Sequence, residues 1–242
     1  MVIDVLTLFP ELFGPFLREG LIGRAVREGR LEVTVVNFRD HGLGRHRKVD
    51  EEPYGGGAGM VLRPEPIFNA VRERRALHRH AGRTVRAILL TPQGRPFDQA
   101  RAQAFAASDE ALLFICGRYE GFDERIRNGL ADEELSLGNF VTLGGEVAAM
   151  AIIEASARLV PGVLGNPDSP AQESFAEGLL EYPQFTRPEE FEGMRVPDVL
   201  RSGNHQAIAR WRAEQAQART AARRPDLLET DDRGTPRRSQ GN

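Results

Sequence analysis

Apolar residues along the chain gather into short runs that glycines and polar turns interrupt. The clearest are Val2–Leu8, Val85–Leu90 and Ala111–Cys116. Runs of this length without regular polar positions are typical of parallel strands that are buried on both faces. Glu32–Phe38 alternates apolar and polar residues, which also predicts a strand. We further interpret the apolar run Leu137–Leu143 as a strand that a Gly-Gly turn closes.

Between these runs the apolar positions recur at the spacing of helices. We predict helices at Pro10–Arg27, Pro64–His80, Asp98–Ala107 and Asn204–Arg223, a short helix that begins near Asp123, and an almost wholly apolar, buried helix that begins at Glu146. Strands that alternate with helices predict an α/β fold built on a parallel sheet.

The composition changes after residue 160, where prolines and glycines become frequent and apolar runs are few. We therefore predict a domain at residues 1–164, an interdomain linker at residues 165–172 and a small, mostly helical domain at residues 173–242. The last helix carries several arginines. A basic helix near a chain end suits RNA binding, and a solvated surface explains it equally well.

Composition narrows the class of protein. The 242 residues are 40% hydrophobic and 28% charged, which is ordinary for a soluble globular protein. A net charge of -3 gives no overall basic field for nucleic acid, although local basic patches remain compatible with it. The N-terminus lacks the pattern of a signal peptide and no apolar run reaches membrane-spanning length, so we expect a cytoplasmic protein without a membrane partner.

Metal and disulfide chemistry find little support in the sequence. The single cysteine, Cys116, excludes an internal disulfide and a cysteine-rich metal site, and we expect its thiol to be buried and inert. The five histidines show no spacing typical of metal ligands, so no metal site is predicted.

Three predicted strand ends are the first candidate site: Leu90–Gly94, Cys116–Gly121 and Leu137–Gly145. Ligands of open α/β sheets bind beyond the carboxyl ends of the strands. Backbone groups there would form an apolar slot suited to a flat heteroaromatic ring. The dinucleotide fingerprint Gly-x-Gly-x-x-Gly does not follow the first strand, which disfavours a Rossmann nucleotide site.

A long polar loop, Arg39–Met60, is the second candidate. Its glycines between Gly55 and Gly59 would let a ligand approach the backbone, and a flexible linker is the plain alternative. It is not a phosphate-binding P-loop, because no Gly-Lys-Ser/Thr follows.

Three charged residues allow both a functional and a structural interpretation. Glu120 is either a ligand contact or a solvated carboxylate in a turn. Arg158 stands four residues after Glu154, and that spacing by itself favours an ion pair on one helix face. Glu173 lies in the proline- and glycine-rich region, where a single carboxylate usually has no special role.

Many short stretches match one known pattern, in order along the chain. They are Leu8–Glu11, Gly23–Val26, Arg45–Arg47, Pro53–Gly57, Thr91–Gly94, Cys116–Gly121, Asp123–Arg125, Leu143–Glu146, Pro161–Gly165, Ser174–Gly178, Tyr182–Pro183, Thr186–Pro188 and Ser202–His205. Through them the chain resembles the bacterial tRNA (guanine-N1)-methyltransferases of the SPOUT superfamily. Agreement at so many separate points is far more specific than a single motif.

The resemblance implies an α/β domain with a deep trefoil knot, a feature that general folding rules would not suggest. It also implies a homodimer with sites shared between subunits. Its activity would be methylation of the guanosine at position 37 of tRNA, next to the anticodon, with S-adenosylmethionine as methyl donor and with dependence on Mg²⁺. The cofactor-binding residues that it implies are Leu90, Pro92, Gly117, Tyr119, Glu120, Leu137, Gly138, Asn139, Phe140, Val141, Thr142, Gly144 and Gly145.

The resemblance assigns catalytic roles to two residues. Arg158 matches the family's catalytic arginine, which changes the preferred interpretation from an ion pair to catalysis. Glu173 stands where the family usually has an aspartate base, so the carboxylate is kept but lies one methylene further from the backbone. The substrate-binding residues implied for tRNA are Arg45, His46, Arg47, Asp50, Gly59, Asn204 and His205.

Two other functions stay open on the sequence alone. The first is an RNA-binding relative that has lost catalysis, which the departure at Glu173 would explain. The second is a nucleotide-binding enzyme that holds phosphate on Gly55–Gly59.

Overall fold

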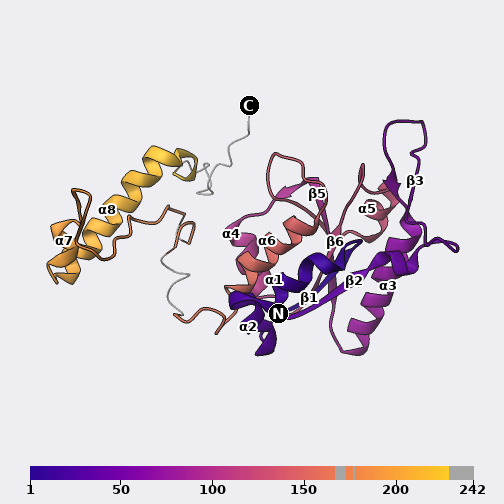
Figure 1. Cartoon of the computed structure of the whole chain (residues 1–242), viewed down its shortest axis with the longest axis horizontal. Coiled ribbons are helices and arrows are strands. Elements are labelled where there is room, and N and C mark those ends of the chain that lie inside the picture. The colour runs from indigo at the N-terminus through magenta and orange to yellow at the C-terminus, as the bar shows by residue number, and fades with distance from the viewer. Residues whose placement is uncertain (167–172, 177, 229–242) are drawn as a thin grey trace. The chain divides into compact units, whose positions relative to one another are not determined.

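The computed structural model describes residues 1–166, 173–176 and 178–228 (Figure 1). Contacts divide the chain into two compact units, Met1–Gly165 and Asn166–Asn242. Most of the linker predicted at residues 165–172 lies outside the described residues.

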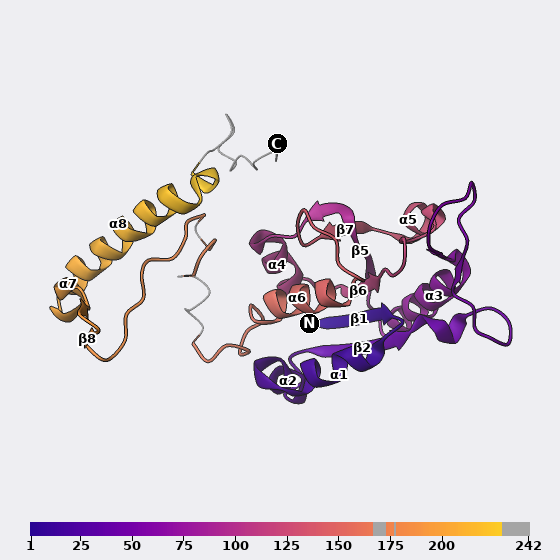
Figure 2. The same ribbon diagram turned by 45° about the horizontal axis from the view of Figure 1, so that its top comes forward.

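A parallel sheet of five strands forms the centre of the first unit, in the order β2-β1-β6-β5-β7 (Figure 2). All its pairings are parallel. The strands are β1 (Val2–Thr7), β2 (Glu32–Asn37), β5 (Val85–Pro96), β6 (Ala111–Cys116) and β7 (Glu133–Ser136). The α/β fold predicted from the sequence is thus confirmed, whereas the trefoil knot stays a prediction.

Helices cover both faces of this sheet, as Figures 1 and 2 show. One face carries α1 (Phe13–Arg18), α2 (Gly20–Arg27), α4 (Gln99–Ala106) and α6 (Glu146–Ala157). The other carries α3 (Pro64–His80), α5 (Glu124–Leu130) and the short 3-10 helix η2 (Phe38–His41). The helices predicted at Pro64–His80, at Asp98–Ala107 and from Glu146 are confirmed, with ends that agree within one residue where both were predicted.

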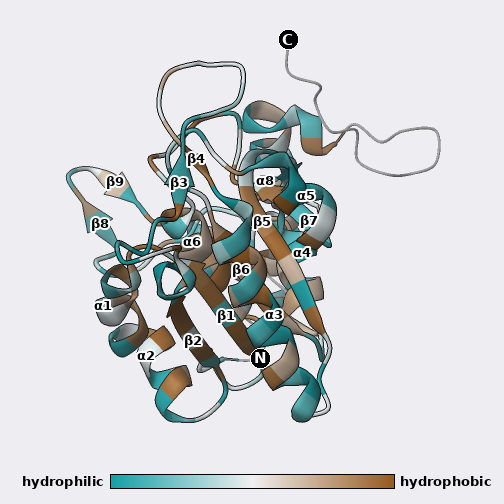
Figure 3. Ribbon diagram, turned by 90° about the vertical axis from the view of Figure 1, so that its right-hand side faces the viewer, coloured by the Kyte–Doolittle hydropathy of each residue, from teal (hydrophilic) through white to brown (hydrophobic). Residues whose placement is uncertain are grey.

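Strand β6 explains why the central strands read as unbroken apolar runs. Its alternate residues Leu112, Phe114 and Cys116 belong to the core on the α6 side, and Leu113 and Ile115 to the core on the α3 side. Because successive side chains of a strand point to opposite faces, a strand with helices on both sides needs apolar residues throughout. Figure 3 shows the same concentration of apolar residues on β1, β2 and β6.

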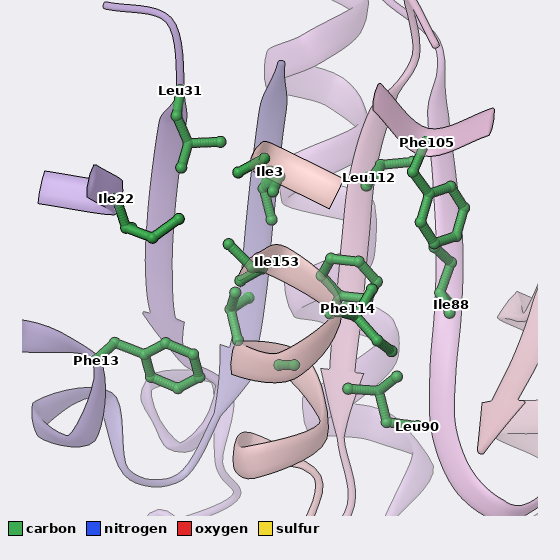
Figure 4. Packing of buried hydrophobic residues seen from close by; sticks show 14 of the residues in the cluster. Ile3, Phe13, Ile22, Leu31, Ile88, Leu90, Phe105, Leu112, Phe114 and Ile153 are labelled. Carbon is green, nitrogen blue, oxygen red and sulfur yellow. The ribbon is translucent and has the colours of Figure 1, made fainter. Parts of the chain in front are cut away.

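The core on the α6 side is built from side chains of both layers. Figure 4 shows Ile153 of α6 between Ile3 of β1 and Phe114 of β6, and all three side chains are fully buried. Burying a side chain of this size contributes about 1.5–3 kcal/mol each. This packing places the first turn of α6 at the end of the sheet.

The helix predicted over Pro10–Arg27 is interrupted. It consists of the 3-10 helix η1 (Pro10–Leu12) followed by α1 and α2. Glu19 between the two α-helices is extended (φ -100°, ψ 160°), and Gly20 has φ +60°. Glycine adopts this left-handed conformation without a steric penalty, so the chain can turn there.

The strand predicted over Leu137–Leu143 was wrong. The last strand of the sheet is β7, which ends at Ser136, and residues 137–145 form a loop. Val141 and Leu143 on this loop are 81% and 91% exposed. Apolar character alone suggested a strand, but no neighbouring strand pairs with this segment in the described part of the chain.

The strand predicted at Val85–Leu90 is longer than expected, and the predicted strand end Leu90–Gly94 lies within it. Strand β5 continues to Pro96, and Leu90 and Arg95 both pair with Leu135 of β7. The residues between them bulge out of the ladder and return to it.

The described residues of the second unit form a small hairpin, two α-helices and a 3-10 helix. Its elements are β8 (Glu190–Phe191), β9 (Met194–Arg195), α7 (Asp198–Arg201), α8 (His205–Arg223) and the 3-10 helix η4 (Pro225–Leu227). The helix predicted at Asn204–Arg223 is α8. Among the described residues, every helix is too short or too polar to cross a membrane.

Candidate functional site

A cavity of about 350 Å³ lies where β5, β6 and β7 reach the carboxyl end of the sheet. Its walls are the bulge of β5, the loop after β6 and the loop between β7 and α6. The lining residues are Leu90, Thr91, Pro92, Gln93, Gly117, Arg118, Tyr119, Glu120, Gly121, Phe122, Glu124, Arg127, Leu135, Ser136, Leu137, Phe140, Val141, Thr142, Leu143, Gly144, Gly145 and Ala148.

The structure brings the cofactor-binding residues predicted from the sequence to this one place. All of them line the cavity except Gly138 and Asn139. Gly138 is instead hydrogen-bonded to residues of the same loop and of the strand end before it. Its N–H donates to Oγ of Ser136 at 3.2 Å, and its carbonyl accepts the N–H of Phe140 at 2.9 Å.

Glycines let the walls of the cavity approach one another. The N–H of Gly145 donates to the carbonyl of Gly117 at 3.0 Å. A Cβ on Gly145 would lie 2.8 Å from Cα of Cys116, and one on Gly117 would lie 2.9 Å from the ring of Phe122. A side chain on Gly145 would push the two loops apart, and one on Gly117 would displace the ring of Phe122, so the cavity presents backbone groups to a ligand.

Beside the cavity lies a buried acid–base cluster that the sequence did not reveal. Glu146, the first residue of α6, has only 1% of its side chain exposed. Its Oε1 accepts the hydroxyl of Thr7 at 2.7 Å, and Nη2 of Arg118 lies 2.9 Å from its Oε2. A single glutamate at the head of an apolar helix, together with an arginine between glycines, was the only signal for this pair in the sequence.

Cys116 ends β6 directly beside this cluster and is fully buried, as predicted. Burial raises the pKa of its thiol well above the usual value, and the negative charge of Glu146 raises it further, against a smaller lowering by Arg118. The thiol is therefore neutral near pH 7 and a poor nucleophile.

The glycine-rich loop 52–60 is the tip of a hairpin formed by β3 (Asp50–Glu51) and β4 (Val61–Leu62). The hairpin is tied to the loop after β6, because Glu120 N–H donates to the carbonyl of Met60 at 3.0 Å. A Cβ on Gly59 would lie 2.3 Å from Oε1 of Glu120. Gly59, predicted to bind substrate, and Glu120, predicted to bind the cofactor, are thus in contact.

The other residues predicted to bind substrate lie on the surface. Arg45, His46 and Arg47 are exposed in a turn, where Nη1 of Arg47 pairs with Asp40 at 2.7 Å. In the second unit, Oδ1 of Asn204 caps α8 by accepting the N–H of Ala207 at 3.1 Å. His205, the first residue of α8, is exposed.

The two predicted catalytic residues belong to different units of the chain. Arg158 follows the last turn of α6, and its N–H donates to the carbonyl of Glu154 at 3.2 Å. The ion pair between their side chains stays a prediction. Glu173 lies in the second unit, and its carbonyl accepts the N–H of Ala176 at 3.1 Å.

The second unit has a wider hollow of about 890 Å³ between α8, α7 and the segment 182–189. The guanidinium of Arg212 lies over the ring of Tyr182 at 4.6 Å, and Phe185 packs 6.4 Å from Trp211. Aromatic rings beside arginines suit contact with nucleic acid. In the described part of the chain, no group of three or more His, Cys, Asp and Glu residues is placed to hold a metal ion.

Comparison with known proteins decides the family. The family described as tRNA (Guanine-1)-methyltransferase TrmD matches residues 1–230. The chain belongs to this family. It is 56% identical over 229 residues to the tRNA (guanine-N(1)-)-methyltransferase of Syntrophotalea carbinolica, covering 95% of this chain and 90% of that protein.

Relatives from other bacteria agree. The protein of the same description from Symbiobacterium thermophilum is 55% identical, with 96% of this chain and 93% of that protein covered. The one from Staphylococcus carnosus is 51% identical, with 94% and 91% covered. The resemblance inferred from separate motifs in the sequence is confirmed over almost the whole chain.

Proposed function

We propose that the protein transfers a methyl group from S-adenosylmethionine to N1 of the guanosine at position 37 of tRNA, next to the anticodon. The observation that carries this proposal is the cavity of bare backbone at the ends of β5, β6 and β7, in a member of this family. When bound, S-adenosylmethionine supplies an electrophilic methyl group on a positively charged sulfur.

The residues of the cavity fit such a ligand. Its volume of about 350 Å³ is within the range of small-molecule sites, roughly 300–1,000 Å³. Main-chain N–H and C=O groups of residues 137–145 can hold the edge of a flat adenine ring. The carboxylate of Glu120 at the rim suits a ligand with positive charge.

The protein must activate N1 of guanine, the atom that accepts the methyl group. N1 of guanine carries a proton at neutral pH, and a general base must remove it as the methyl group arrives. Negative charge then builds on O6, which a fixed cation stabilises. We assign the base to Glu173 and the cation to Arg158, on the family's pattern. Alignment of the two reactants supplies much of the remaining rate gain.

We propose that the protein is a homodimer whose sites are completed by the partner subunit. Val141, Leu143 and Val147 beside the cavity are 81%, 91% and 62% exposed, and apolar side chains gathered like this favour cover by another surface. We also propose that the chain threads through a trefoil knot at the cavity loops, and that its domains follow the predicted boundaries.

Contacts with tRNA would come from the exposed turn at Arg45–Lys48, from Asp50 and Gly59, and from α8 with Asn204 and His205. Phosphate contacts by these arginines make affinity for tRNA fall as salt rises. We place the protein in the cytoplasm with its substrate, and include Mg²⁺ in the assay because the family resemblance implies it.

The decisive experiment uses tRNA transcripts with guanosines at positions 36 and 37 and S-adenosylmethionine labelled on the methyl group. We expect one label per tRNA, on N1 of guanosine 37, and none when that base is adenosine. Label at another position, or no transfer, would refute the proposal. Calorimetry with ATP distinguishes the nucleotide-binding alternative, since we expect ATP to bind poorly.

Two variants test the residue roles. We expect Glu173→Gln to lose most of its turnover while its affinity for S-adenosylmethionine stays near normal. We expect Arg158→Ala to lower turnover about 10²- to 10³-fold, as when one stabilising donor is removed from a developing anion. Normal turnover with a large loss of thermal stability would instead return Arg158 to the role of an ion-pair partner.

A further inference from the structure

Glu146 is a charged group buried at the wall of the cavity. It opens α6, where the helix dipole stabilises a negative charge. Thr7 at the end of β1 donates its hydroxyl to Oε1, and the same hydroxyl accepts the N–H of Phe9 at 2.9 Å. Burial of a carboxylate is costly unless it is paired, so its partner matters.

That partner is Arg118, which lines the cavity and has 20% of its side chain exposed. Nε lies 3.3 Å from Oε1 of Glu146, and Nη1 donates to the carbonyl of Leu143 at 3.3 Å. The guanidinium also lies 4.4 Å from the ring centre of Phe9. One side chain thus connects the end of β1 with two of the loops that wall the cavity.

The space around this contact is closed. A Cβ on Gly144 would lie 2.4 Å from Nε of Arg118 and 2.6 Å from Oε2 of Glu146. Although Nη2 is 2.9 Å from Oε2, the angle falls short of a hydrogen bond, and Oε2 has no such partner among the described residues. The attraction between Arg118 and Glu146 therefore combines the hydrogen bond from Nε to Oε1 with the attraction of opposite charges.

The positive charge of Arg118 influences the affinity of the cavity for the proposed ligand. S-adenosylmethionine has a positive sulfonium, whereas its demethylated product has a neutral thioether and is otherwise the same. An uncompensated guanidinium on the cavity wall would disfavour the donor and leave the product almost unaffected. As a general scale, two unit charges about 10 Å apart in a medium with an effective dielectric constant of about 20 change an affinity on the order of tenfold.

We propose that Thr7, Glu146 and Arg118, the buried triad, position the two cavity loops and neutralise the arginine so that the cationic methyl donor is not disfavoured against the neutral product. This inference rests on the proposed function. The triad contains positioning residues, because none of its members needs to touch the reacting atoms.

Calorimetry with S-adenosylmethionine and with S-adenosylhomocysteine tests the charge. The quantity of interest is the ratio of the donor's Kd to the product's Kd. Glu146→Gln leaves an unpaired positive charge and should raise this ratio about tenfold. Arg118→Gln leaves a negative charge and should lower it. The double variant is neutral again and should return the ratio close to that of the wild type.

Two variants separate position from charge. Arg118→Lys keeps the charge and loses the contact with Leu143, so both ligands should weaken together while the ratio stays near normal. Thr7→Val removes a hydroxyl without a change in charge and should behave in the same way. Thermal unfolding of each variant verifies that it is folded.

The buried pair of Asp4 and Arg74 supplies a matched control, because neither residue lines the cavity. Asp4→Asn should lower thermal stability and leave the ratio unchanged. A ratio that stays the same in the single charge variants would overturn the inference, and Arg118→Gln alone decides the matter if Glu146→Gln does not fold. Wild-type protein that binds neither ligand would refute the proposed function itself.

Discussion

Two buried carboxylates, Asp4 and Glu146, lie on opposite faces of the sheet, and each has 1% of its side chain exposed. Asp4 receives two hydrogen bonds from Arg74, at 2.8 and 2.9 Å, and its Oδ2 lies 2.8 Å from Nε2 of His78. Both partners belong to α3. This arrangement fastens one helix to the sheet.

Glu146 differs because its partners come from separate segments. Thr7 ends β1, and Arg118 lies in the loop after β6, with Nη2 at 2.9 Å from Oε2 and Nε at 3.3 Å from Oε1 of Glu146. A carboxylate whose partners lie on one helix fastens that helix to the sheet, whereas a carboxylate whose partners come from separate segments fixes those segments relative to one another. A buried carboxylate paired with an arginine therefore fastens a helix at Asp4 and connects loops at Glu146.

The largest effect on stability should follow from Asp4→Ala. The substitution leaves the buried His78 and the mostly buried Arg74 without their carboxylate partner, and breaking a buried pair costs about 3–5 kcal/mol. For a domain of this size the loss corresponds to a fall in Tm of roughly 10 °C. Thermal unfolding measures it, and Glu28→Ala, which breaks an exposed pair with Arg30, serves as the control with little change. An unchanged Tm in Asp4→Ala would show that the contacts of Asp4 do not stabilise the fold, contrary to the role inferred for this carboxylate.

Gly145→Ala should damage the cavity more than the fold. The new Cβ would lie 2.8 Å from Cα of Cys116, and overpacking of this kind costs about 1–3 kcal/mol. We expect affinity for both S-adenosylmethionine and its product to fall more than tenfold, because the two loops must move apart. Gly165→Ala is the matched control, since nothing lies within 4 Å of its Cβ position. Binding by Gly145→Ala at wild-type strength would contradict the close approach of the loops.

The ion pair between Asp123 and Arg125 is partly exposed, and we expect it to contribute less to stability than the pairs of the two buried carboxylates. Asp123 caps α5 and pairs with Arg125 at 2.7 Å. The hydrogen bond from Arg125 lowers the pKa of Asp123, against a smaller opposing effect of burial. Because 69% of Arg125 is exposed, we expect Arg125→Ala to change the stability at neutral pH far less than Asp4→Ala does.

The sign of the pH dependence follows from that lowered pKa. The stabilisation is present above the unfolded pKa of Asp123, near its ordinary value of 3.8, and is lost as pH falls through the lower folded value. Unfolding curves of the wild type and Arg125→Ala should therefore converge in strong acid. A difference that grows on acidification would show that another group controls it.

The last prediction concerns the reactivity of the Cys116 thiol, which we expect to be very low in the folded protein. Its raised pKa and full burial predict a neutral thiol that thiol reagents do not modify at about pH 8 while the protein is folded. Mass spectrometry should show labelling only after denaturation. Rapid labelling of the folded protein would mean that β6 opens beside the cavity more readily than its packing indicates.

The sequence alone determined the parts of the fold in which local pattern and tertiary environment agree. Ala111–Cys116 is apolar throughout because both faces of β6 are covered, and Pro64–His80 has helical spacing with a proline at its start. The cofactor segments were also predictable, since glycines after buried strands indicate close approach of the backbone. Their match to a known family then supplied the chemistry.

Only the tertiary structure decided the remainder. Leu137–Leu143 has the composition of a strand and is a loop, because β7 takes the place beside β5 and ends at Ser136. Gly59 meets Glu120, and Arg118 meets Glu146, across 61 and 28 residues of chain respectively. Contacts between distant segments depend on how the strands are ordered in the sheet. Local residue preferences carry no information about that order, so the buried triad became visible only in the folded chain.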